Sequence, residues 1–204
     1  NCMAHGSVPI WNTRQGSVSR CSEDYKAHDP VRARLHLHNS YQNMLFLGQT
    51  IWGDHDMFHS TDSVEAEVMA RSKALSGGPV YISDLPDQMV TARILPLVDD
   101  RGEVLRPLAP ATALPESLFI DPYLDGKPYR VIAPCEGGAA SLCVYNLTNP
   151  EVPVTGFISM KDYPWASALM QGEGRPWAMP EEGVVAYDTA NQTAMRLVEE
   201  PWTF

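Results

Sequence analysis

The strongest constraint on this sequence is an alternation of strand-like runs and helix-like patterns in the first ninety residues, with acidic side chains after the strand-like runs. Residues 17–21 and 79–82 have strand character, and Asp24 and Asp84 follow them. A strand–helix alternation predicts parallel βα units. In a parallel β/α barrel, side chains at the carboxyl ends of successive strands converge on one pocket. The sequence therefore predicts an α/β region with a carboxylate-lined site.

Two helices are expected between these strands. The first begins at Asp29, which can cap it, with Pro30 in its first turn. The apolar run 45–47, followed by Gly48, has the composition of a buried parallel strand. The second helix is capped by Ser60 or Asp62 and ends at the glycine pair 77–78.

After about residue 100 the pattern changes to short strand-like runs separated by Gly, Pro, Asn and Asp. These runs are 129–133, 141–145, 154–159 and 184–187. They predict an antiparallel β-sandwich. The 204 residues are fewer than the roughly 250 of a complete eight-fold barrel, and residue 1 is Asn. We therefore expect a fragment of class α/β plus all-β. Residues 1–98 would form the C-terminal half of a (β/α)8 barrel, and residues 99–204 the sandwich.

Charge and cysteine content narrow the classes of partner. The formal net charge is −10 and Lys and Arg form no cluster, which argues against nucleic acid. No apolar run approaches the roughly 18 residues of a membrane span, so we expect no membrane partner. The four cysteines show no CxxC and no zinc-ribbon spacing. Free thiols in a reducing compartment, and hence a cytoplasmic protein without a bound metal or cofactor, are the expectation.

The first polar constellation is Arg20-x-Ser22-x-Asp24. If this segment is extended, the three side chains point the same way. An arginine favours the ionised form of a neighbouring carboxyl and burial opposes it, so such a group can be tuned for general acid/base catalysis. A surface ion pair at a strand-to-loop turn explains the same spacing.

The second constellation is Asp54-His55-Asp56 with His59, preceded by Trp52. The carboxylates could accept hydrogen bonds from sugar hydroxyl groups while the indole stacks on an apolar sugar face. Asp and His are also metal ligands, although this spacing matches no standard metal signature. A third reading is an acidic loop that caps the following helix. Asp84 has two readings as well, a site carboxylate or a turn-stabilising one.

Several segments, in this order, resemble glycoside hydrolase family 36, within it the group of raffinose synthases, seed imbibition proteins and alkaline α-galactosidases. The matching segments are Cys2-Met3-x-His5, Arg20-x-Ser22-x-Asp24, Asp54-x-Asp56-Met57-Phe58-His59-Ser60, Ser76-Gly77-Gly78-Pro79-Val80-Tyr81-Ile82-Ser83-Asp84 and Phe119-x-Asp121-Pro122-x-x-Asp125-Gly126. The resemblance covers most of residues 1–150. Gly53 and His55 depart from it, because Pro and Trp are common there in the family.

The resemblance implies a retaining enzyme that cleaves α-galactosides or transfers galactosyl groups, on a (β/α)8 barrel with a C-terminal β-sandwich. Asp24 matches the general acid/base. The family's nucleophile lies in a Lys-x-Asp segment, whose position here would fall before Asn1, so the isolated chain is expected to be inactive. An oligosaccharide is the implied substrate. The candidate substrate-binding residues are Arg20, Trp52, Asp54, Asp56, Met57, Cys2 and His5.

Three alternatives stay open from the sequence. Galactosyl transfer, as in raffinose synthesis, uses the same catalytic pair as hydrolysis. A non-catalytic sugar-binding protein could keep the barrel motifs without the nucleophile. A metalloenzyme is the third.

An incomplete barrel would expose two parallel sheet edges and an apolar wall. We therefore predict that the isolated chain self-associates or aggregates. Size-exclusion chromatography with light scattering should show species larger than the 22.6 kDa monomer. A monomer with a sharp, cooperative thermal transition would contradict this prediction.

Overall fold

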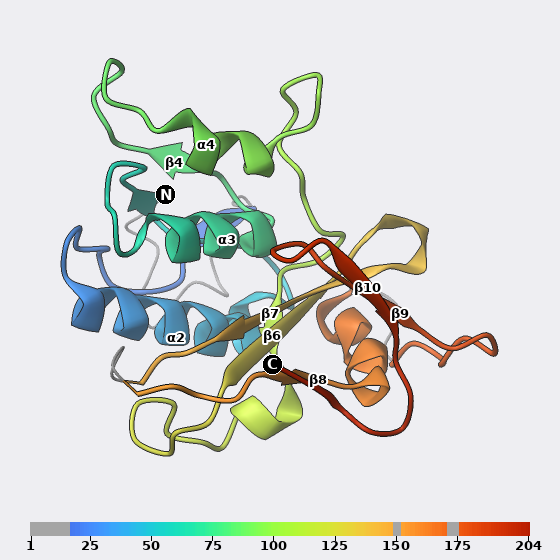
Figure 1. The fold of residues 1–204 in the computed structure, drawn as a ribbon. Coiled ribbons are helices and arrows are strands. Elements are labelled where there is room, and N and C mark those ends of the chain that lie inside the picture. The colour runs from blue at the N-terminus through green and yellow to red at the C-terminus, as the bar shows by residue number, and fades with distance from the viewer. Residues whose placement is uncertain (1–16, 149–151, 171–175) are drawn as a thin grey trace.

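The computed structural model describes residues 17–148, 152–170 and 176–204. Two helices, α2 (Pro30–Leu47) and α3 (Ala66–Ser76), are in contact in the N-terminal half, and the longest antiparallel strands pack next to α2 (Figure 1). No helix in these ranges combines the length and the apolar character needed to cross a membrane.

The N-terminal strands pair in parallel, as the strand–helix alternation predicts. Strand β1 (Val18–Arg20) pairs with β2 (Trp52–Asp54), and β3 (Met57–Phe58) pairs with β4 (Tyr81–Ile82). A further parallel bridge joins Gly53 to Gly77. Both strand-like runs of the sequence, 17–21 and 79–82, thus contain a strand.

Residues 45–47 form the last turn of α2, so the expectation of a strand there is wrong. Burial along the helix recurs at Leu37, Tyr41 and Met44, and the amide of Gly48 donates to the Met44 carbonyl oxygen (2.9 Å). Phe46 is exposed, which a strand buried on both faces would not allow. A short apolar run fits a helix or a strand equally well, and here the helical burial pattern continues through it.

The start of α2 and the end of α3 agree with the prediction, whereas α3 begins only at Ala66, after Glu65, which makes no side-chain cap. The Asp29 side chain accepts a hydrogen bond from the Arg32 amide (3.1 Å), which caps α2. Asp62 accepts hydrogen bonds from the Val64 and Glu65 amides (2.9 and 3.1 Å) ahead of α3. Gly77 ends α3 in the left-handed conformation.

The C-terminal half is mostly antiparallel, as predicted. Its three-stranded sheet has the order β5 (Thr112–Ala113), β6 (Tyr129–Pro134), β7 (Ala140–Tyr145). Two further pairs are β9 (Val185–Asp188) with β10 (Thr193–Arg196), and β8 (Phe157–Ile158) with β11 (Trp202–Thr203). Short helices complete the described ranges: α4 (Thr91–Ile94), η1 (Leu95–Leu97), η2 (Pro115–Ser117), η3 (Glu136–Gly138) and η4 (Met160–Leu169).

The helix η4 is a feature that the sequence expectations omitted. A capping box at its start gives the local signal. The Ser159 side chain accepts a hydrogen bond from the Lys161 amide, and the Asp162 side chain accepts one from the Ser159 amide. None of the small sheets closes into a barrel within the described residues. The half-barrel, the sandwich and the boundary at residues 98/99 stay predictions.

One hydrophobic core joins the two predicted regions. Tyr41 of α2, Tyr129 of β6 and Tyr145 of β7 are buried together, and the hydroxyl groups of Tyr41 and Tyr145 are 2.9 Å apart. Burying an aromatic side chain of this size contributes about 1.5–3 kcal/mol. Helix α2 is therefore held between the strands that carry the acidic segments and the β5–β7 sheet.

A buried ion pair ties β6 to η4. The Arg130 guanidinium lies 2.7 Å from the buried Asp162 and 3.0 Å from the exposed Glu116, and it stacks over the Phe157 ring at 3.9 Å. Removing one partner of a buried pair leaves the other charge without compensation.

We predict that Asp162→Ala lowers the free energy of unfolding by about 3–5 kcal/mol, because it removes a cap of η4 and the buried partner of Arg130, which keeps the exposed Glu116. Glu116→Ala is the matched control and should cost less than about 1 kcal/mol, since its carboxylate is exposed. Urea denaturation followed by tryptophan fluorescence measures both. Equal effects of the two substitutions would show that the pair does not stabilise the fold in this way.

Candidate functional site

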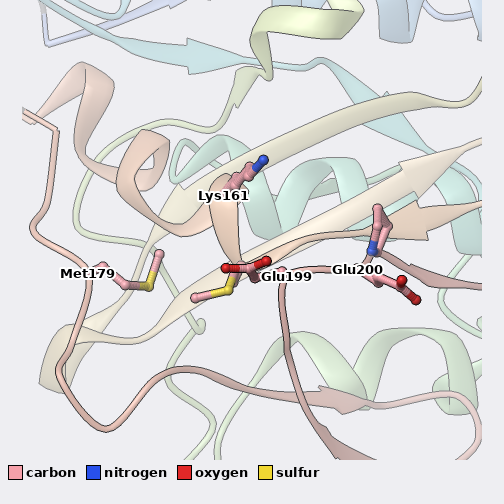
Figure 2. Close-up of a pocket in the computed structure, with 6 residues that line it drawn as sticks. Lys161, Met179, Glu199 and Glu200 are labelled. Atoms are coloured by element: carbon pink, nitrogen blue, oxygen red, sulfur yellow. The ribbon is translucent and has the colours of Figure 1, made fainter.

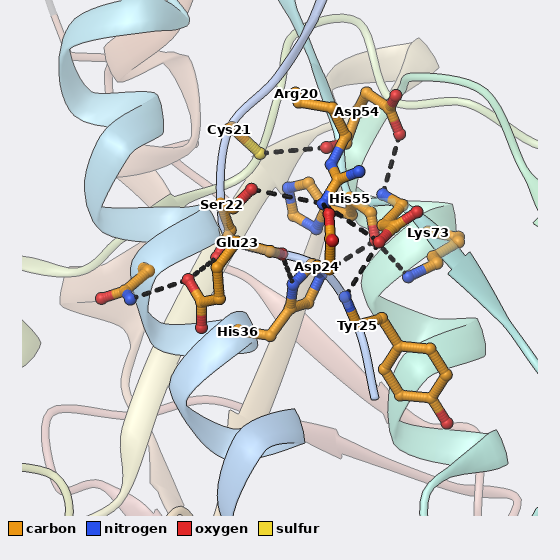
Figure 3. A network of polar contacts seen from close by, with 12 residues as sticks. Arg20, Cys21, Ser22, Glu23, Asp24, Tyr25, His36, Asp54, His55 and Lys73 are labelled. Atoms are coloured by element: carbon orange, nitrogen blue, oxygen red, sulfur yellow. Dashed lines mark hydrogen bonds and ion pairs between the residues drawn. The ribbon is translucent and has the colours of Figure 1, made fainter. Parts of the chain in front are cut away.

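The candidate site forms where β1 and β2 end side by side. The parallel register places Arg20, the last residue of β1, opposite Asp54, the last residue of β2. The chain then turns away from each strand and presents Asp24 on one loop and Asp56 on the other. Figure 3 shows Arg20, Asp24 and Asp54 gathered together next to α2 and α3.

One guanidinium nitrogen joins the two loops. Arg20 Nη2 lies 3.2 Å from an oxygen of Asp24 and 3.0 Å from an oxygen of Asp56. The Arg20 side chain is 8% exposed, that of Asp56 14% and that of Asp24 75%. The site therefore has an open carboxyl group on one side of a buried arginine and a shielded carboxylate on the other.

The shielded carboxylate is fixed in its orientation. Asp56 has a φ of 61°, a left-handed conformation that Asp tolerates better than most residues. Its side chain accepts a hydrogen bond from the Tyr25 amide (2.9 Å), and its own amide donates to the Asp54 side chain (2.8 Å). Asp54 and Asp56 are thus locked relative to each other and to the loop that carries Asp24.

The arrangement of residues 20–24 differs from the expected extended segment. Strand β1 ends at Arg20, and the chain bends so that Arg20 Nη2 also lies 3.4 Å from the Ser22 carbonyl oxygen. The Ser22 hydroxyl donates to Glu23 instead (2.6 Å). Arg20 and Asp24 meet because the loop folds back, and the Ser22 side chain does not join them.

His55, between the two aspartates, faces the interior. It is completely buried, and its Nδ1 lies 2.6 Å from the Ser72 hydroxyl of α3. Burial, reinforced by the neighbouring Lys73 and His36, lowers the pKa of His55 well below its ordinary value. Within the described ranges, no three His, Cys, Asp or Glu side chains are placed to hold a metal ion.

The remaining predicted site residues are Trp52, Met57, Cys2 and His5, and the structure describes two of them. Trp52 is the first residue of β2, and its ring covers the backbone of Gly77, leaving no room there for a side chain. Met57 begins β3 and is partly exposed, directly after Asp56. Cys2 and His5 lie outside the described residues.

Asp84 stabilises a loop rather than facing Arg20. Its carboxylate accepts hydrogen bonds from the Ser60 amide (2.6 Å) and from the amide and hydroxyl of Thr61 (3.0 and 2.6 Å). Partial burial opposes ionisation, but these hydrogen bonds outweigh it and hold the pKa of Asp84 well below its ordinary value. Of the two readings of Asp84, the turn-stabilising one agrees with these hydrogen bonds.

Lys73 is the residue near the site that the sequence expectations missed. It lies on α3 with its ammonium close to His55 (Figure 3). Its signal is visible in the sequence, because Lys73 continues the buried stripe formed by Ala66, Met69 and Ala70 at helical spacing. A lysine is rarely buried on the apolar face of a helix unless another group compensates its charge.

Two cavities lie elsewhere, in the C-terminal half. One, of about 540 Å³, is open to solvent and lined by residues that include Lys161, Met179, Glu199 and Glu200 (Figure 2). The other, of about 340 Å³, lies beside the strands β6 and β9. Neither is lined by Asp24 or Asp56.

Comparison with known proteins identifies the class. The family model described as "Raffinose synthase or seed imbibition protein Sip1" matches residues 1–146. The chain belongs to this family, which is part of the glycoside hydrolase family 36 group. The match contains Arg20 and the three aspartates around it, Asp24, Asp54 and Asp56, here called the Arg20 cluster. It also contains every other predicted site residue.

Individual relatives are galactosyltransferases by name. The chain is 35% identical over 145 residues to probable galactinol–sucrose galactosyltransferase 6 of Arabidopsis thaliana, covering 71% of this chain and 19% of that protein. It is 38% identical over 126 residues to the galactinol–sucrose galactosyltransferase of Pisum sativum (58% and 16%) and 34% identical over 185 residues to that of Oryza sativa subsp. japonica (77% and 23%). The chain thus spans about a fifth of the length of the curated relatives it matches.

We predict that Asp84→Asn destabilises the protein in a pH-dependent way. A carboxyl whose folded pKa is depressed stabilises the fold fully above its unfolded pKa, about 4, and loses that contribution as the pH falls further. The difference in melting temperature between wild type and Asp84→Asn should therefore be largest near pH 7 and shrink below pH 4.

The control is Asp87→Asn, three residues further along on the exposed part of the same loop. It should leave the melting temperature nearly unchanged at every pH. A pH-independent difference for Asp84→Asn would show that the carboxylate charge is not what stabilises the loop.

Proposed function

We propose that the protein carrying this chain transfers an α-galactosyl group with retention of configuration, with Asp24 as the general acid/base. The observation that carries the proposal is the meeting of Asp24 and Asp56 at one nitrogen of Arg20, inside the segment that matches the family. The names of the relatives, galactinol–sucrose galactosyltransferases, support a galactosyl donor and a sucrose acceptor.

The exposure of the two carboxyl groups suits two different roles. The Asp24 carboxyl is largely open to solvent, so it can reach the oxygen that joins the galactosyl group to its leaving group. Asp56 is mostly shielded and held by the Tyr25 amide and Arg20, which suits a fixed acceptor for sugar hydroxyl groups. The Asp54 side chain orients Asp56 by accepting a hydrogen bond from the Asp56 amide.

The proposed reaction has two displacements. A nucleophilic carboxylate attacks the anomeric carbon, the bond from that carbon to the leaving oxygen breaks, and Asp24 gives that oxygen a proton. Asp24 then takes a proton from the acceptor hydroxyl, which attacks the same carbon and releases the nucleophile. The nucleophile must lie about 5–5.5 Å from the Asp24 carboxyl. The family resemblance puts it in a Lys-x-Asp segment that precedes the position of Arg20.

Hydrolysis is the competing outcome of the same chemistry, because water can replace the acceptor hydroxyl in the second displacement. Product analysis with a galactosyl donor, in the presence and absence of sucrose, separates the two. A trisaccharide formed only with sucrose supports transfer, whereas free galactose in equal amount under both conditions favours hydrolysis. Binding of galactosides without either product would favour a non-catalytic sugar-binding protein.

We predict that Asp24→Asn in the full-length protein lowers the turnover of a natural galactoside by roughly 10²–10⁴-fold, the usual contribution of a general acid/base. An aryl α-galactoside with a strongly acidic phenol as leaving group should lose much less in the first displacement, because that group leaves without protonation. Azide should then accelerate the second displacement and yield the α-galactosyl azide, because azide needs no base.

Asp87→Asn serves as the control and should retain the wild-type rate and show no azide effect. Near-native turnover of the natural substrate by Asp24→Asn would remove Asp24 from the acid/base role. A β-configured azide product would contradict the retaining mechanism.

A further inference from the structure

A buried lysine lies beneath the loop that carries Asp54 and Asp56. Lys73 of α3 is 1% exposed, and its ammonium donates a hydrogen bond to the backbone carbonyl of His55 (Figure 3). Lysine is almost never fully buried unless its charge is compensated. In the ranges that the structure describes, Lys73 has no carboxylate at ion-pair distance. The cost of burying this charge is offset by the His55 carbonyl, by the ring of Tyr25 and by the more distant Asp54 and Asp56.

Three side chains contact His55, and two of them, Lys73 and Ser72, belong to α3. Its carbonyl oxygen is contacted by Lys73 Nζ and by His36 Nε2 of α2 (2.9 Å), while its ring contacts Ser72. The residues on either side of this fixed peptide are the two aspartates of the site. The orientation of their side chains therefore depends on the position of the His55 backbone.

His36 alone does not secure that carbonyl. Its Nδ1 lies 2.7 Å from the Glu23 carbonyl oxygen and its Nε2 lies 2.9 Å from the His55 carbonyl oxygen. A neutral imidazole has only one N–H to donate. Burial lowers the pKa of His36, and the charge of Lys73 lowers it further. When His36 donates to Glu23, Lys73 is the donor that satisfies His55.

The charged groups around Lys73 come from every neighbouring element. Asp54 and Asp56 on the β2–β3 segment attract the ammonium, as an ionised Cys21 thiol would, while Arg20 of β1 and His36 of α2 repel it when charged. The Tyr25 ring lies 5.9 Å from Nζ. Burial is the dominant influence and lowers the pKa of Lys73 to about 7, with the attraction of Asp56 and Asp54 opposing it.

We propose that Lys73 is a positioning residue for the loop that carries Asp54 and Asp56. Its buried ammonium fixes the His55 carbonyl and thereby orients these two side chains toward the substrate. The inference rests on the proposed function. It adds a residue that touches no substrate and that acts through the backbone between two site carboxylates. Loss of the Lys73 proton would loosen this hold, so substrate binding should weaken as the pH rises through neutrality.

The test compares Lys73→Met with wild type in the full-length protein. Methionine fills similar volume without the charge or the donor. We expect kcat/KM for the galactosyl donor to fall by roughly 10–100-fold, as for other residues that orient a site from behind. Lys73→Gln, which keeps a donor without the charge, should lie between the two. Lys127→Met, at an exposed lysine, is the matched control and should be unaffected.

A binding measurement separates positioning from catalysis. The inhibition constant of free galactose requires no proton transfer. In wild type it should rise about tenfold between pH 6 and pH 9, because Lys73 loses its proton in this range. In Lys73→Met it should be high at both pH values and nearly independent of pH.

Thermal stability shows whether Lys73 serves the fold instead. A lysine whose folded pKa is below its unfolded value destabilises the fold most at low pH, and the fold gains stability as the pH rises from about 7 toward 10.5. Lys73→Met removes this penalty, so its melting temperature at pH 6 should equal or exceed that of wild type. A lower melting temperature together with an activity loss that Lys73→Gln does not reduce would overturn the proposal.

The outcomes also separate this inference from the proposed function. An active wild type with unchanged kcat/KM and an unchanged galactose pH profile in Lys73→Met overturns the role of Lys73 alone. A wild type that neither transfers nor hydrolyses α-galactosides at any pH overturns both.

Discussion

The parallel pairing of β1 and β2 is the constraint on which the candidate site depends. In this register Arg20 and Asp54 end neighbouring strands, so the loops that follow leave the sheet at the same edge. One nitrogen of Arg20 can then contact Asp24 from its own loop and Asp56 from the next. A shift of one strand by one residue would turn its side chains to the opposite face of the sheet relative to its partner and separate the three groups.

Carboxylates in this region divide into two uses that composition does not distinguish. Asp62 and Asp84 direct their oxygens at backbone amides and hold loops, with hydrogen bonds that favour their charged forms. Asp24 instead combines an arginine contact with an open face. A carboxylate surrounded by amides has little capacity left for a substrate, so the clamping aspartates make the site rigid and leave the chemistry to the others.

Two buried cations show how differently one fold can satisfy such groups. Arg130 pairs directly with the buried Asp162, and the pair joins β6 to η4 in a region far from the Arg20 cluster in sequence. Lys73 has a backbone carbonyl as its partner, with Asp54 and Asp56 acting on it only at longer range. A direct ion pair compensates a buried charge far better than a carbonyl does, because the carbonyl carries only a partial charge. The arrangement at Lys73 therefore favours a site that trades stability for geometry.

The sequence alone determined the features that depend on neighbours along the chain: the cap at Asp29, the strand over Tyr81–Ile82, the antiparallel runs after residue 100 and the family to which the acidic segments belong. It could not decide that residues 45–47 extend a helix, that Ser22 turns away from Arg20, or that Lys73 lies under His55. The packing of α2 against the sheet and the position of Lys73 depend on contacts between segments far apart in the chain, where burial and charge are set by what packs against a residue. Only the tertiary structure brings those segments together, so only it decided which acids meet and which are already occupied.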